Sequence, residues 1–120
     1  MYQEKMVLCG ANSYEEKYYF NEDFAALPSA IQDELKILCV LFVSEIGGIL
    51  TLVFEEDGTL CFQVASEEND FFFDEIGSGL KVRQMQREHR ELLEALELYY
   101  RVVFLGEKVE DLGNNTGDGQ

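Results

Sequence analysis

The hydrophobic pattern of the chain is most regular near its C-terminal end. Seven positions follow one another there at alternating intervals of three and four residues, the spacing of a helix with one apolar side. These positions, referred to below as the heptad seam, are Val82, Met85, His89, Leu92, Leu96, Tyr99 and Val103. Gly106 follows, where glycine commonly ends a helix. The pattern predicts one helix from Leu80 to Leu105, about 39 Å long, packed on a sheet, a second helix or a second copy of the chain.

Two β-hairpins are predicted in the remainder of the chain. The runs Met6–Cys9 and Tyr14–Phe20 are β-prone and flank a segment rich in turn-forming residues. Ile49–Phe54 and Thr59–Ala65 flank an Asp-Gly turn, a strong signal for a hairpin. Short connections of this kind favour antiparallel pairing, so the hairpins predict a small antiparallel sheet.

A helix is predicted between the two hairpins. Pro28 suits the first turn of a helix, because its missing N–H has no partner there. Apolar residues then recur at helical spacing, at Ile31, Leu35, Leu38, Phe42 and Ile46. The segment 37–43 is apolar throughout, which predicts a helix buried on most sides and leaves a buried strand as the alternative.

The fold class expected from these elements is α+β. The order is β-β-α-β-β-(β)-α, with four to five antiparallel strands in one domain (residues 1–106), packed by two helices of which the C-terminal one is long. Phe71–Phe73 is either the fifth strand or the first turn of that helix, and Gly77–Gly79 is a break before Leu80. Residues 107–120 are acidic and rich in glycine and asparagine, which predicts a flexible tail.

Composition narrows the range of partners and compartments. The chain has 120 residues and a formal net charge of −15, which makes nucleic acids and anionic membranes unfavourable partners. Its three cysteines form no C-x-x-C pair, and we find no signal segment and no apolar run of membrane-spanning length. We therefore expect a cytoplasmic protein with reduced thiols.

Motifs for catalysis or ligand binding are weak. The sequence around Gly77–Lys81 lacks the hydroxyl residue of a phosphate-binding loop, and the acidic turns lack the frame of a calcium loop. His89 is the one histidine, either a packed hydrogen-bonded residue or a group that tunes association with pH. Zinc binding requires the fold to gather Cys9, Cys39 and Cys61 around His89, which we do not expect. We predict no catalytic residue, no cofactor and no metal.

Three stretches carry a resemblance to a known family. They are LCGANSYEEKYYFNED (8–23), GGILTLVF (47–54) and FDEIGSGLK (73–81). Together they resemble a family of short uncharacterised proteins, a domain of unknown function, from Clostridia-type Firmicutes, over about residues 1–106. This resemblance implies a bacterial, cytosolic protein and no particular activity. By element order alone the chain is also similar to roadblock/longin domains, and fold analogy does not give function.

The interpretation that we prefer is a non-enzymatic interaction or adaptor module. We expect it to form a homo-oligomer or to bind another protein, with the heptad seam as the candidate interface. The alternative is a small-molecule-binding or enzymatic domain with a pocket between sheet and helices. A deep pocket lined by His89, Tyr99 or a cysteine favours that alternative.

Overall fold

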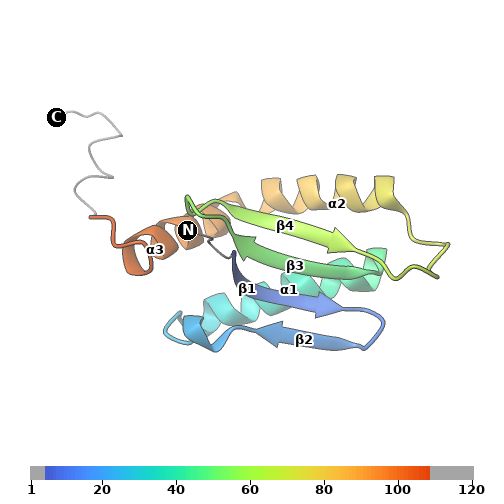
Figure 1. Ribbon diagram of the computed structural model, residues 1–120, viewed down its shortest axis with the longest axis horizontal. Helices are drawn as coiled ribbons and strands as arrows, with labels where there is room; N and C mark the ends of the chain where they lie inside the picture. The colour runs from blue at the N-terminus through green and yellow to red at the C-terminus, as the bar shows by residue number, and fades with distance from the viewer. Residues whose placement is uncertain (1–4, 109–120) are drawn as a thin grey trace.

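Both predicted hairpins form, and they join through their first strands into one antiparallel sheet (Figure 1). The computed structural model describes residues 5–108. The strands of this segment are β1 (Met6–Asn12), β2 (Lys17–Phe20), β3 (Ile49–Phe54) and β4 (Leu60–Ala65), in the sheet order β2-β1-β3-β4. Its helices are the short 3₁₀ helix η1 (Glu22–Phe24), α1 (Ser29–Ile46), α2 (Glu75–Glu88) and α3 (Arg90–Val103). The predicted α+β class is confirmed; the flexible tail was predicted for residues that lie mostly outside the described range.

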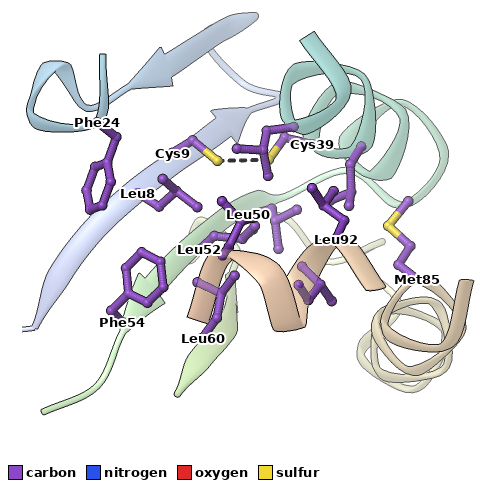
Figure 2. Close-up of a cluster of buried hydrophobic side chains, with 14 of the residues drawn as sticks. Leu8, Cys9, Phe24, Cys39, Leu50, Leu52, Phe54, Leu60, Met85 and Leu92 are labelled. Atoms are coloured by element: carbon purple, nitrogen blue, oxygen red, sulfur yellow. Dashed lines mark hydrogen bonds between the residues drawn. The ribbon is translucent and has the colours of Figure 1, made fainter. Parts of the chain in front are cut away.

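One hydrophobic core joins the sheet to α1 and α3. A register shift between Val7 and Cys9 forms a bulge in β1, so the adjacent residues Leu8 and Cys9 are both fully buried. Their neighbours in the core include Leu50 and Leu52 of β3 (Figure 2). At one end of this core, aromatic rings from the sheet, η1 and α3 stack on one another, and the rings of Phe54 and Tyr100 lie 4.2 Å apart.

Helix α1 forms as predicted, but it is not buried on most sides. Leu35, Leu38, Cys39 and Phe42 face the core. The opposite side of the helix exposes Ile37 and Leu41 by 58% and 50%. The apolar run therefore indicated helical structure correctly and overestimated how much of the helix the sheet covers.

The predicted long C-terminal helix is wrong in two respects. It is broken at His89, which is the C-cap of α2 and the N-cap of α3. Its first part also begins earlier, at Glu75, because the Asp74 Oδ1 accepts a hydrogen bond from the Gly77 N–H at 2.9 Å and caps the helix. A Cβ at position 77 would lie 2.3 Å from the Asp74 carboxylate, so glycine belongs to this cap instead of marking a break.

Phe71–Phe73 is neither a fifth strand nor a helical turn. It lies in the irregular loop 66–74 that connects β4 to α2. Within residues 5–108, no helix has both the length and the apolarity that crossing a membrane requires.

Candidate interaction surface

The heptad seam faces the core of its own chain over most of its length. Met85, Leu92 and Leu96 are buried in the core, and Val82 and Tyr99 pack against it. Of the partners that the sequence left open for this side of the helix, the chain's own core is therefore the one that covers Leu92 and Leu96. Val103, at the end, is 56% exposed. A role for the heptad seam in an interface stays a prediction, and its buried members contact a partner only if the core opens.

Helix α2 is attached to the rest of the chain by few contacts. Of its 14 residues, Ser78 and Met85 are buried. The Lys81 Nζ lies 2.7 Å from a carboxylate oxygen of Glu45 on α1, which adds one ion pair. The next helix, α3, has the same length and buries Leu92, Leu93, Leu96 and Tyr100. In Figure 1, α2 lies at the periphery of the molecule.

Four large apolar side chains are exposed on α2 and in the loop before it. Phe71 and Phe72 are 86% and 97% exposed, and Ile76 and Leu80 are 78% and 56% exposed. At about 100° per residue, Ile76 and Leu80 lie on the side of α2 opposite the buried Met85. These four residues are named the α2 apolar surface. Large exposed apolar side chains within one short segment of the chain indicate a candidate binding surface.

Hydrogen bonds fix the loop that presents the two phenylalanines. The Tyr14 hydroxyl donates to the Asp70 Oδ2 at 2.5 Å and accepts from the Glu67 N–H at 3.2 Å. The bond to the Asp70 carboxylate raises the pKa of Tyr14 above its ordinary value. The ring of Phe73 packs on Gly48, where a Cβ would lie 2.6 Å from the Phe73 Cε1. Phe71 and Phe72 are therefore held on a fixed loop and still face solvent.

Basic residues continue along the exposed side of α2. Arg83 and Arg87 follow Leu80 at intervals of three and four, so they share the side of Ile76 and Leu80. Together with Arg90 they line one side of a groove of about 460 Å³, whose remaining lining includes the acidic residues Glu94 and Glu97 of α3 and the start of β4. The loop 66–74 carries the opposite charge, with four acidic residues and no basic one.

His89 lies beside a separate open cleft at the junction of α2 and α3. The cleft has a volume of about 650 Å³, and its lining includes Glu34 of α1 as well as Arg87 and Arg90. The His89 Nδ1 is 3.6 Å from a carboxylate oxygen of Glu34. Neither Tyr99 nor a cysteine lines this cleft, and it lies between helices instead of between sheet and helices.

Two cysteines that are far apart in the sequence meet in the core. The Sγ atoms of Cys9 and Cys39 are 3.8 Å apart, and both residues are fully buried (Figure 2). The contact with the Cys9 sulfur and burial raise the pKa of the Cys39 thiol, which keeps it protonated. Cys61 does not join them, since it pairs with Val53 on the other face of the sheet. Within residues 5–108, no group of three potential metal ligands forms.

Comparison with known proteins places the chain in a family. Residues 5–108 match the model of DUF6145, a family of unknown function. The chain therefore belongs to DUF6145, and the resemblance to an uncharacterised family is confirmed. No curated protein and no solved structure matches the chain significantly.

Proposed function

We propose that this protein is a non-enzymatic interaction module of the bacterial cytoplasm that works by self-association. The observation that supports this function best is the combination found in α2. This helix buries two of its residues in its own chain and exposes large apolar side chains on the opposite side. The loop that presents Phe71 and Phe72 is fixed by the hydrogen bonds of Tyr14, so a partner can bury these two side chains without a further entropy cost of ordering the loop.

The stability of α2 gives a second argument. An isolated helix of about this length is marginal in water, and Gly77 and Gly79 lower its helix propensity further. It is anchored by the buried Met85, by Val82, which packs against the core, and by the ion pair of Lys81 with Glu45. A partner that covers the α2 apolar surface would supply the packing that the chain itself does not provide.

The alternative function, small-molecule binding, has less support. The cleft beside His89 is open and its lining mixes arginine with glutamate. Such a site lacks the enclosed, mainly apolar walls that are typical of ligand pockets.

The mass of the protein in solution tests the proposal. Light scattering coupled to size exclusion, over a range of micromolar concentrations, should give about twice the chain mass of 13.8 kDa. The double variant Phe71→Ser/Phe72→Ser should shift the protein to the monomer, because it removes two of the four apolar side chains. The matched control is Ile37→Ser/Leu41→Ser on α1, where apolar residues of similar exposure to Leu80 are removed. A wild-type monomer at every concentration contradicts self-association.

A further inference from the structure

We propose that the occupant of the α2 apolar surface is a second copy of the chain, bound antiparallel along α2. In this arrangement Arg83 and Arg87 of each copy face the acidic loop 66–74 of the other. The inference rests on the proposed function and specifies which surface and which partner carry it out.

Net charge restricts how two copies can meet. Each chain has a formal charge of −15, so most pairs of surfaces repel one another. The loop 66–74 holds Glu67, Glu68, Asp70 and Asp74 without a base, which is a net charge of −4. Helix α2 holds three bases and two acids, which is a net charge of +1. The exposed apolar residues Ile76 and Leu80 therefore have acidic residues before them, in the loop 66–74, and basic residues after them, along α2.

The order of residues along α2 sets the direction of pairing. Ile76, Leu80, Arg83 and Arg87 form one stripe at intervals of four, three and four, with the apolar pair first and the basic pair second. In a parallel pair, each arginine would meet the same arginine of the other copy. In an antiparallel pair with twofold symmetry, Ile76 of one copy packs on Leu80 of the other and the basic ends point in opposite directions.

The rise of an α-helix per residue then gives the positions of the charged residues along the antiparallel pair. With the twofold axis near position 78, Arg83 lies about 7.5 Å and Arg87 about 13.5 Å along the helix from the axis. Asp74, at the N-cap of the other copy, lies about 6 Å from the axis in the same direction. Arg87 therefore extends past the start of that helix and reaches its acidic loop. In this arrangement the rings of Phe71 and Phe72 can form cation–π contacts with the same guanidinium groups.

Gly79 is consistent with a close approach of α2 from the second copy near position 79. A Cβ built at position 79 meets no atom of its own chain within 4 Å, so packing in the single chain does not require glycine there. Glycine inside a helix is nevertheless less favourable than alanine. Position 79 adjoins Ile76 and Leu80, next to the expected twofold axis, where a bare backbone leaves room for the second helix.

Two charge variants that complement each other test the arrangement. The first is Arg83→Glu/Arg87→Glu, and the second is Glu67→Lys/Glu68→Lys. Each variant alone places like charges across both halves of the interface, so we expect dimer affinity to fall by about 100-fold. When the two variants are mixed, opposite charges meet again at both halves. We expect a heterodimer with an affinity close to that of the wild type, detected by native mass spectrometry with one variant isotopically labelled.

The controls separate this inference from the proposed function. Glu15→Lys/Glu56→Lys changes the net charge as much as the second variant does, at exposed sites outside the loop and α2, and should leave the dimer intact. Circular dichroism verifies that every variant is folded. If the wild type is a dimer and each variant also dimerises by itself, the α2 arrangement is overturned while self-association still holds. Variants that are monomeric both alone and mixed overturn the antiparallel pairing, and a monomeric wild type overturns both proposals.

Discussion

Helices α2 and α3 follow one another directly, have 14 residues each, and differ in how the chain supports them. Helix α3 buries three leucines in the core and stacks Tyr100 on Phe54 at 4.2 Å. Helix α2 buries one methionine and one serine. The apolar periodicity that predicted a single helix runs through both of them. Periodicity therefore shows which side of a helix is apolar, and it does not show how much protein lies beneath that side.

The strongest test of this comparison is one leucine in each helix. Leu96→Ala in α3 should lower the free energy of unfolding by about 2–5 kcal/mol, because the leucine is 2% exposed and its removal leaves a cavity. Leu80→Ala in α2 should change it by less than about 0.5 kcal/mol in the dilute monomer, since this leucine is 56% exposed. Urea titrations of the two variants give both values. Equal losses would show that α2 is supported as well as α3.

Alkaline pH should weaken the core. Burial raises the pKa of Tyr18 and Tyr100, and contact with Cys9 together with burial raises the pKa of Cys39. The unfolded chain loses these protons first, so stability is complete below the ordinary pKa values and falls as pH rises through about 8.5 for cysteine and about 10 for tyrosine. At pH 10, Cys39 alone should cost about 2 kcal/mol.

Thermal melts between pH 7 and pH 10.5 measure this loss. The control is Tyr18→Phe, which removes one titrating group. The Tyr18 hydroxyl is buried without a hydrogen-bond partner in the described part of the chain. The variant should therefore be at least as stable as the wild type at pH 7 and lose less stability in alkali. A melting temperature that is constant up to pH 10.5 contradicts the protonated core.

The smallest expected effect concerns Gly79. Gly79→Ala should stabilise the dilute monomer by up to about 1 kcal/mol, because alanine favours the helix and the space around position 79 is open. The same change should weaken the dimer, since the added methyl group separates the two helices. Urea titration at low concentration and light scattering at high concentration measure the two effects. A variant that gains monomer stability and dimerises more tightly would exclude a close approach at this position.

Much of the fold could be predicted from the sequence. The Asp-Gly turn, the β-prone runs and the helical spacing around Leu35 and Leu38 are local signals, and both hairpins and α1 form where these signals lie. The break at His89 could not be predicted, because the heptad spacing continues unchanged across it. The early start of α2 depends on the Asp74 cap at Gly77, whose sequence reads equally well as a turn.

The candidate surface was predicted less well. The heptad seam predicted an interface on the apolar side of the C-terminal helices, and the core of the same chain covers most of that side. Phe71 and Phe72 were ambiguous, since their exposure depends on the contact of Tyr14 with Asp70, 56 residues apart in the sequence. Interactions between distant residues of this kind leave no local pattern. The sequence does contain one signal: polar and acidic residues flank the three phenylalanines on both sides, which is not typical of a buried strand.

The strand order β2-β1-β3-β4 has a consequence for the protein during its synthesis. The inner strand β1 pairs with β3, and the whole of α1 lies between them in the sequence. Until Phe54 has left the ribosome, β1 of the nascent chain has one open edge, because its partner strand β3 is incomplete. The first half of the chain therefore lacks the inner strand pairing of the sheet, and we expect truncated chains that end before Phe54 to need chaperone protection.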